Sequence, residues 1–326
     1  MWILSTPVLV AIIIILVIVA LVTKAKYIAL VLILLLIIVN WYSQSIAVHP
    51  FTSGRINAEK RDASVLRVMT YNLWNGGIYL GKHTNSPAPE LVKSIDSIHA
   101  DVLLLCELNH TDNPLLMDSL LKRYPYNSYV LTDSDNTNEV QVLSRYPIQE
   151  VRRVAYTDSL GQKSDALIWL MKIATPQGNV NLAACHLASN KYGSIRDSMK
   201  ATASWWSGRH QYLKYLRLGY DERKREAVAL RDSLDRMTGP IIAMGDFNDI
   251  GGSYTVRRTM GDDLNDAWWS GGLGYGFTYD MYHLLLRLDH ILYSDDKLEL
   301  QGVKVLSDWK YSDHYPLVAD FKYNMN

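Results

Sequence analysis

A short segment near residue 245 places a carboxylate and an amide two residues apart. Residues 241–244 form an apolar run bounded by Pro240 and Gly245, which is typical of a buried strand. Asp246 and Asn248 follow at its carboxyl end, and alternate residues of an extended chain point the same way. Such a pair suits a site that positions water and stabilises charge on a phosphoryl oxygen. Because Asp and Asn are also ordinary turn residues, the segment alone predicts no activity.

Other apolar, strand-like segments along the chain also end in residues that can do chemistry. Their ends read Thr70-Tyr71-Asn72, Leu105-Cys106-Glu107, Leu143-Ser144-Arg145, Ala184-Cys185-His186, Leu288-Asp289-His290 and Ser312-Asp313-His314. Loops at the ends of strands are where rigid scaffolds place catalytic groups. We therefore expect these polar residues to share one rim of the fold.

The elements that must position these residues alternate between strand and helix early in the chain, and strands dominate the middle. Helices are predicted at 89–100, 113–124, 221–237 and 253–260. Strands are predicted at 65–71, 101–106, 128–132, 139–144, 150–156, 166–173, 179–186, 241–244, 288–293, 298–306 and 315–321. Residues 187–215 read as a polar insertion with Trp and Tyr. This order favours an α/β fold of two packed sheets flanked by helices, and a single doubly wound sheet is the alternative.

Charge and cysteine content limit the classes of protein that fit. The 326 residues include 33 Lys and Arg and 33 Asp and Glu, and 1–50 contain only Lys24 and Lys26 among them. This balance argues against a protein that coats nucleic acid through clustered basic residues, although a nuclease with a local groove fits. Cys106 and Cys185 lie in apolar runs and are expected to be buried free thiols.

The first 43 residues are the most apolar part of the chain. Residues 2–23 carry no charge and, at about 1.5 Å per residue, could cross a hydrocarbon layer of roughly 30 Å. A second apolar run covers 27–42. We expect two transmembrane helices in 1–43, a linker at 44–64 and one catalytic domain at 65–326. A signal peptide followed by a core helix is the alternative, but the first run lacks a basic start and a cleavage site.

The two lysines between the apolar runs predict the orientation in the membrane. Basic residues are enriched in cytoplasmic loops, so Lys24 and Lys26 place the turn of the hairpin in the cytoplasm. We therefore expect an integral membrane protein whose catalytic domain lies outside the cytoplasm, on the periplasmic side of an inner membrane.

Taken in order, the strand ends resemble those of the endonuclease/exonuclease/phosphatase superfamily, which has the deoxyribonuclease-I-like fold. The resemblance runs from about Val65 to Phe321 and points to a membrane-anchored, bacterial-type member. It implies a four-layer α/β/β/α sandwich that cleaves phosphate esters with Mg²⁺, or with Mn²⁺ in its place. Two segments depart from the family pattern: 140–142 has no small residue before Ser144, and 249–252 replaces the usual proline-containing turn.

The resemblance also implies which residues bind metal and activate water. Glu107 and Asn72 are the expected metal ligands, and Asp313 is expected to reach the metal or a water on it. Asp246 is expected to orient or deprotonate the attacking water. Glu107 in a salt bridge and Asn72 in a turn are the structural alternatives.

Four further residues are expected to bind the phosphoryl group or to support a residue that does. Asn248 and His186 look like donors to the non-bridging oxygens in the transition state. His314 looks like the histidine that contacts the scissile phosphate, with Asp289 fixing its tautomer and orientation.

Three functions remain open from the sequence. They are a metal-dependent phosphodiesterase or phosphatase held at a membrane, a nuclease acting on DNA or RNA, and a membrane-anchored binding protein without catalysis. Every residue type that the chemistry needs is present, which favours an enzyme. The expected partners are a phosphate-ester substrate, which can be a lipid, a nucleic acid or a small molecule, and the membrane; no obligate protein partner is inferred.

Overall fold

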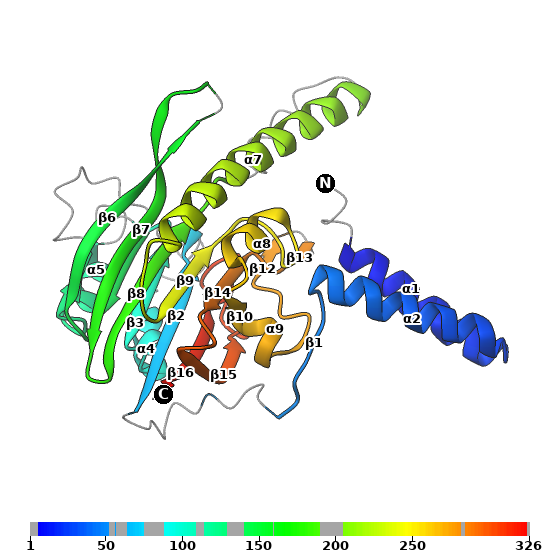
Figure 1. Cartoon of the computed structure of the whole chain (residues 1–326), viewed down its shortest axis with the longest axis horizontal. Coiled ribbons are helices and arrows are strands. Elements are labelled where there is room, and N and C mark those ends of the chain that lie inside the picture. Colours follow the sequence, from blue (N-terminus) through cyan, green and yellow to red (C-terminus); the bar gives the residue numbers. More distant parts are fainter. Residues whose placement is uncertain are drawn as a thin grey trace.

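Two helices at the amino terminus form a hairpin that projects from the rest of the molecule (Figure 1). The structure, a computed structural model, describes residues 6–51, 56, 64–74, 88–108, 114–128, 140–158, 160–189, 205–281 and 284–324. The helices are α1 (Thr6–Val22) and α2 (Lys26–Ser43). Lys24 lies in the turn between them with a φ of 61°.

The hairpin lies within the residues for which two transmembrane helices are expected. The described helices have 17 residues in α1 and 18 in α2. Within the described residues, no helix has both the length and the apolar character needed to cross a membrane, so this expectation is not confirmed.

Two six-stranded sheets form the body of the molecule. The first contains β2 (Val65–Asn72), β3 (Val102–Cys106), β4 (Tyr126–Asn127), β5 (Val140–Ser144), β15 (Leu298–Val305) and β16 (Leu317–Tyr323), in the order β15-β16-β2-β3-β5-β4. The second contains β6 (Ile148–Thr157), β7 (Lys163–Thr175), β8 (Gly178–His186), β9 (Ile241–Asp246), β10 (Asn265–Asp266) and β14 (Asp289–Tyr293), in the order β10-β14-β9-β8-β7-β6. Both sheets are mixed, because β2–β3 and β8–β9 pair in parallel while their other neighbours are antiparallel.

The central strands β2, β3 and β9 are buried on both faces, and alternate residues enter different cores. Leu66 and Val68 of β2 pack between the two sheets, whereas Met69 and Tyr71 pack on the outer face. In β9 the inner face likewise contributes to the core between the sheets, and the outer face to a second core. A continuous apolar run such as that of β3 is the sequence pattern of a strand covered on both sides.

Helices cover the outer face of each sheet. Those on the first sheet are α4 (Ala88–Ile98) and α5 (Pro114–Leu121), and those on the second are α7 (Trp205–Leu234) and α8 (Tyr254–Met260). The short helix α9 (Ala267–Gly271) packs near β14 and β15. The result is a helix–sheet–sheet–helix arrangement, which confirms the α/β fold with two mixed sheets and excludes a single doubly wound sheet (Figure 1).

The segment after the hairpin, predicted as an irregular linker, is partly built into the domain. Ala47–Val48 forms β1, which pairs with β11 (Leu273–Gly274). Nη2 of the buried Arg287 also donates to the backbone oxygen of Gln44 at 3.3 Å, just beyond α2. The end of the hairpin is therefore in direct contact with the domain. Residues 52–55 and 57–63 of the predicted linker lie outside the described residues.

Helix α7 is longer than the sequence predicts. The predicted helix covers 221–237, but α7 begins at Trp205, within the segment read as an insertion. The preceding part of that insertion, 190–204, lies outside the described residues. The last described residues before it, 187–189, follow directly on β8 and lead toward the site described next.

Candidate active site

Three of the predicted site residues lie side by side at one end of the second sheet. His186 of β8 and Asp246 of β9 are register partners in a parallel pair, and Asp289 of β14 is the antiparallel partner of Asp246. Each therefore stands at the same level of the sheet. The pairing register of the strands thus brings together residues that the sequence placed at strand ends.

The first sheet supplies two more predicted residues at the same rim. Asn72 of β2 is the parallel partner of Cys106, and Glu107 follows with a left-handed φ of 56°. Nδ2 of Asn72 donates to Oε1 of Glu107 at 3.1 Å and to Oδ2 of Asp246 at 2.9 Å. Asn72 thus connects the functional ends of the two sheets.

Asp246 lies at the centre of this group. Its side chain is 1 % exposed, and its Oδ2 lies 3.9 Å from Nε2 of His186 and 3.8 Å from Nε2 of His314. Nε2 of His186 is also 3.7 Å from Oε1 of Glu107. One buried carboxylate therefore faces an amide and two imidazoles, from elements that are far apart in the sequence.

Asp289 and His314 come together as predicted. Nδ1 of His314 lies 2.8 Å from Oδ2 of Asp289, and both side chains are buried. Burial alone lowers the pKa of His314, but the charges of Asp289, Asp246 and Asp313 outweigh it and raise the pKa to about 10. His314 is therefore a cation at neutral pH, with Nε2 directed toward Asp246.

Asn248 occupies a different position from the one expected for a phosphate donor. It has a φ of 50°, its backbone N–H donates to Oδ1 of Asp246 at 2.7 Å, and its Nδ2 donates to the backbone oxygen of Leu187 at 2.9 Å. One side-chain N–H of Asn248 is therefore used in a hydrogen bond to Leu187, in the loop after β8. An amide nitrogen carries two hydrogens, so donation by the second to a phosphate stays a prediction.

The predicted metal ligands are Glu107, Asn72 and Asp313. Within the described residues, no three His, Cys, Asp or Glu side chains form a group that could hold a metal ion. Glu107 and Asn72 are adjacent, while Oδ1 of Asp313 accepts a hydrogen bond from Ser312. Burial raises the pKa of Asp313 to about 6, a shift that the charge of His314 opposes and that of Glu107 increases.

Those residues nevertheless fit a hard divalent cation. Mg²⁺ is commonly bound by one or two carboxylates, and water and substrate phosphate complete its shell. Glu107 supplies a partly exposed carboxylate and Asn72 an amide oxygen, which at present accepts from the backbone N–H of Trp74. The negative charges of Glu107 and Asp313 repel each other, and a bound cation would reduce this repulsion.

Two features of the site carried no recognisable sequence signal. The ring of Tyr279 stands edge-on to that of His314 at a centroid distance of 4.9 Å, and the two residues form a backbone bridge. Tyr279 begins β12 (Tyr279–Met281), which pairs with β13 (Leu284–Leu286). Thr278, next to it, accepts from the backbone N–H of Asp289 at 2.9 Å. An irregular segment before β12 gave no pattern from which to predict these contacts.

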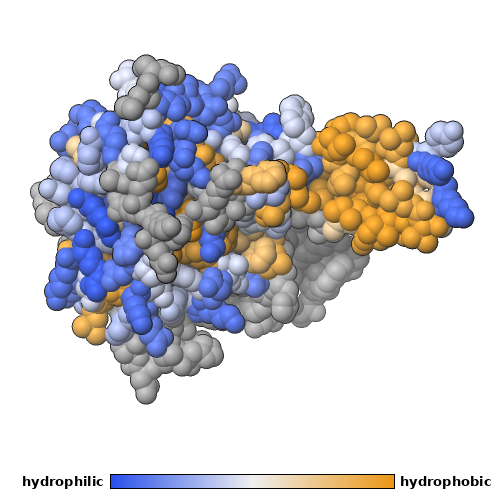
Figure 2. All heavy atoms as spheres, turned by 90° about the horizontal axis from the view of Figure 1, so that it is seen from below, coloured by the Kyte–Doolittle hydropathy of each residue, from blue (hydrophilic) through white to orange (hydrophobic). Residues whose placement is uncertain are grey.

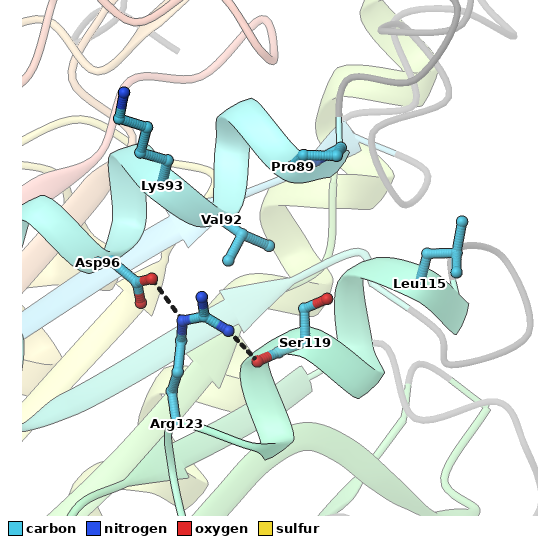
Figure 3. Close-up of a pocket in the computed structure, with 7 residues that line it drawn as sticks. All are labelled: Pro89, Val92, Lys93, Asp96, Leu115, Ser119 and Arg123. Atoms are coloured by element: carbon cyan, nitrogen blue, oxygen red, sulfur yellow. Dashed lines mark hydrogen bonds and ion pairs between the residues drawn. The ribbon is translucent and has the colours of Figure 1, made fainter.

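A pocket of about 370 Å³ lies between α4 and α5, away from the strand ends (Figure 3). Arg123 lies across it, with Nε donating to Asp96 and Nη1 donating to the backbone oxygen of Ser119 at 2.8 Å. None of the predicted site residues lines this pocket. The rim of the two sheets is therefore the candidate active site.

Solved structures with the same arrangement place the fold. The catalytic domain of human Nocturnin matches with a TM-score of 0.54 and 18% identity, over 80% of this chain and 95% of that chain. An endonuclease/exonuclease/phosphatase from Bacteroides vulgatus matches with a TM-score of 0.56 and 13% identity, over 80% and 99%. Truncated TDP2 of Caenorhabditis elegans matches with a TM-score of 0.55 and 17% identity, over 79% and 97%. At these identities the likeness establishes the fold.

The sequence itself establishes the family. No curated protein matches the chain significantly. The family model described as "Endonuclease/Exonuclease/phosphatase family" matches residues 69–314, which include all but the ends of the two-sheet domain and every predicted site residue. The members of this family are phosphoester hydrolases, and they generally use divalent metals. The chain therefore belongs to the endonuclease/exonuclease/phosphatase family of hydrolases.

Proposed function

We propose that the chain is a divalent-metal-dependent hydrolase of phosphate esters in which Asp246 activates the attacking water. The observation that carries the proposal is the setting of Asp246, a buried carboxylate within 4 Å of imidazole nitrogens of both His186 and His314. Glu107 is joined to it through the amide of Asn72. A base, two potential phosphate donors and a candidate metal ligand thus share one site.

The proposed reaction is a displacement at phosphorus. A water molecule transfers a proton to Asp246 as its oxygen bonds to phosphorus, and the bond from phosphorus to the leaving oxygen breaks. His314, held as a cation by Asp289, donates through Nε2 to a non-bridging oxygen, and His186 donates through its own Nε2. The leaving oxygen takes up a proton from solvent water, so a diester gives a monoester and an alcohol.

Glu107 and Asn72 are the residues that would hold the metal. Asp313 lies close enough for its carboxylate to interact with the charge of Glu107, and it could supply a further oxygen. When bound, Mg²⁺ or Mn²⁺ neutralises charge on the phosphate and polarises its phosphorus–oxygen bonds. The buried protein groups around the site exclude bulk water, so each of these interactions acts at low local dielectric.

Hydrolysis of bis-p-nitrophenyl phosphate by the full-length protein in detergent tests the proposal. We expect release of p-nitrophenol with Mg²⁺ or Mn²⁺, loss of activity with EDTA, and recovery when the metal is restored. A folded protein whose rate is the same with and without EDTA would contradict metal dependence.

A second set of substrates separates the alternatives. Plasmid DNA, RNA, sphingomyelin-type lipids and inositol phosphates should be compared at equal enzyme concentration. Selective turnover of nucleic acid would favour a nuclease. Folded protein that turns over none of these substrates would favour a binding protein of the same fold.

We also propose that the α1–α2 hairpin attaches the protein to a lipid surface. Large apolar side chains are exposed on the hairpin, including Ile15, Ile18, Leu34, Ile38 and Trp41. Figure 2 shows that the projecting hairpin has a largely apolar surface. Exposed apolar surface of this extent marks interaction with a membrane or with another protein. Only Lys24 and Lys26 are charged in this region, which favours lipid as the partner.

The position of the catalytic domain outside the cytoplasm stays a prediction from Lys24 and Lys26. A reporter enzyme fused after Asn326 tests it. We expect activity of a reporter that works only outside the cytoplasm, and activity only of a cytoplasmic reporter would contradict the prediction.

A further inference from the structure

Two charged side chains of α7 hold both backbone groups of a single residue beside the site. Oε2 of Glu226 accepts from the N–H of Ala188 at 2.8 Å, and Nη1 of Arg223 donates to the oxygen of Ala188 at 2.8 Å. Glu226 and Arg223 are three residues apart on α7 and therefore lie on one face of the helix. They are 5 % and 2 % exposed.

Ala188 belongs to the segment that carries a candidate catalytic histidine. It lies two residues after His186, and the intervening Leu187 is fixed on its other side. The N–H of Leu187 donates to the backbone oxygen of Asp246 at 2.9 Å, and its oxygen accepts from Nδ2 of Asn248 at 2.9 Å. The segment 186–188 is thus fixed between α7 and the loop after β9.

Arg223 reaches that second loop as well. Its Nε lies 3.7 Å from Oδ2 of Asp249, a buried residue that follows Asn248 directly. The same carboxylate oxygen accepts from Oγ1 of Thr255 at 2.8 Å. One face of α7 therefore contacts the loop after β8 and the loop after β9, and both loops carry candidate catalytic residues.

Stability alone explains this arrangement poorly. Burying an arginine and a glutamate costs desolvation energy, and apolar residues of similar volume often stabilise a fold equally well or better. The cost is visible at Glu226, because its burial raises the pKa of that carboxyl to about 7. Glu226 and Arg223 are costly to bury, and both form hydrogen bonds to the backbone of Ala188 next to the site. This combination points to a role in positioning.

We propose that Glu226 and Arg223 are positioning residues for the hydrolase reaction, which hold His186 in place through Ala188. The expected effect on kcat rests on the proposed function. The hydrogen bonds to Ala188 do not depend on that function. Both hydrogen bonds are made to the backbone of Ala188, so we expect their effect to be on the orientation of His186.

The first experiment separates orientation from substrate binding. In full-length protein, Glu226→Ala should lower kcat for bis-p-nitrophenyl phosphate by about tenfold to a hundredfold, with a smaller change in KM, since a misplaced catalytic group costs rates of that order. Glu226→Gln keeps an acceptor oxygen and should restore kcat to within about threefold of wild type. Folded Glu226→Ala with wild-type kcat would overturn the proposal, as would equal losses in both variants.

A matched control lies one helical turn away on α7. Glu222 is only half-buried, and it accepts from the hydroxyl of Tyr156 rather than from the loop after β8. Glu222→Gln and Glu222→Ala should leave kcat within about twofold, since the hydrogen bond that they change is to β6 and not to the loop after β8. Loss of kcat in these variants equal to that in Glu226→Ala would show a general effect of α7.

Hydrogen–deuterium exchange tests the structural clamp, which consists of the hydrogen bonds from Glu226 and Arg223 to the backbone of Ala188, without any substrate. The amide of Ala188 should exchange slowly in wild type and Glu226→Gln, and at least about tenfold faster in Glu226→Ala, because it loses its acceptor. Unchanged exchange in Glu226→Ala would overturn the proposal. If wild type proves inactive on every phosphate ester while this exchange pattern holds, the proposed function fails and the structural clamp stands.

Discussion

The pairing of Asp289 with His314 is the residue-scale feature with the clearest electrostatic consequence. The 2.8 Å contact fixes which imidazole nitrogen carries the proton directed at Asp289, and it keeps His314 charged. Asp289→Asn should preserve the shape of the site and lower kcat by about 10²- to 10⁴-fold, because the amide no longer stabilises the imidazolium and the neutral ring can then carry its proton on the wrong nitrogen. Steady-state kinetics on bis-p-nitrophenyl phosphate measures the effect.

A control for this substitution lies in the turn that follows the same strand. Asp295 follows β14, is exposed, and is remote from the rim of the site. Asp295→Asn should leave kcat unchanged within about twofold. Wild-type kcat in folded Asp289→Asn would show that the pair is structural only.

The buried carboxyl of Glu226 predicts a specific pH dependence of stability. Its pKa is about 7 in the folded protein, mainly because of burial, against an ordinary value of 4.5 for an exposed glutamate. Between these values the folded state binds the extra proton, so stability falls as pH rises from about 4.5 to about 7 and changes little above that. A shift of this size corresponds to about 3 kcal/mol.

Urea unfolding between pH 5 and pH 8 measures this contribution. Glu226→Gln has no proton to lose, so its free energy of unfolding should approach that of wild type at pH 5 and exceed it by about 3 kcal/mol at pH 8. The groups whose charges bear on Glu226, and which remain in the variant, are Tyr156, Cys185, His186, Glu222 and Arg223. A constant difference across this range would contradict the assignment.

Residues of the site differ in how far the sequence could predict them. Asp246 and His186 end apolar strands and Glu107 follows one directly, so the repeated strand-end pattern was sufficient to predict a common rim. Glu226 and Arg223 sit in a charged helix whose mean hydropathy is low, where they look like solvent-exposed residues. Their burial arises only when α7 packs on the second sheet, and no local pattern encodes that contact.

At the scale of elements, the join between the hairpin and the domain depends on a close approach of two backbones. Gly252 has a φ of 74°, and a Cβ there would lie 2.5 Å from the backbone oxygen of Ser43 at the end of α2. The segment 249–252, which stands where the family usually has a proline-containing turn, is therefore the part of the domain that contacts the end of α2. A glycine at this position lets the chain pass the end of the hairpin.

Gly252→Ala should destabilise the protein through this contact. We expect a loss of at least about 2 kcal/mol, which combines an unfavourable φ with a backbone clash. Gly239→Ala is the matched control, because Gly239 has a φ of 89° but open space around it, and it should lose only about 1 kcal/mol. Equal losses in urea unfolding would show that the hairpin contact contributes nothing.

The same join is stabilised by a buried charged group. Arg287 donates to Asp266 at 2.6 Å, His290 lies 2.8 Å from the same carboxylate oxygen, and Arg287 also reaches Gln44. Burial opposes ionisation of Asp266, but the charges of Arg287 and His290 overcome it and lower its pKa. His290, which the sequence places on the strand face opposite to Asp289, thus serves this join rather than the active site.

At the scale of the whole molecule, the hairpin and the two-sheet domain are connected but differ in surface. The domain surface is mixed, whereas the hairpin surface is apolar (Figure 2). The order of helices and strands was enough to predict two packed sheets, because each strand shows its own periodicity. The turn of the hairpin could also be predicted, because Lys24 and Lys26 interrupt the apolar sequence where α1 ends and α2 begins.

Attachment to lipid is testable by flotation with liposomes. Replacing Ile15 and Ile38 on the hairpin by glutamate should reduce flotation at least about tenfold, since each charge would have to leave water for an apolar environment. Leu160→Glu is the control, because Leu160 is more exposed than either residue but lies in the turn between β6 and β7. Undiminished flotation of the double variant would contradict attachment through the hairpin.

The account depends most directly on Asp246 as the group that takes the proton from water. The decisive measurement is kcat of full-length Asp246→Asn on bis-p-nitrophenyl phosphate with Mg²⁺, beside Asp232→Asn on the exposed face of α7 as a control. We predict that Asp246→Asn remains folded and loses at least about 10³-fold in kcat, while the control stays within about twofold of wild type. A folded Asp246→Asn variant with kcat near that of wild type would contradict the account.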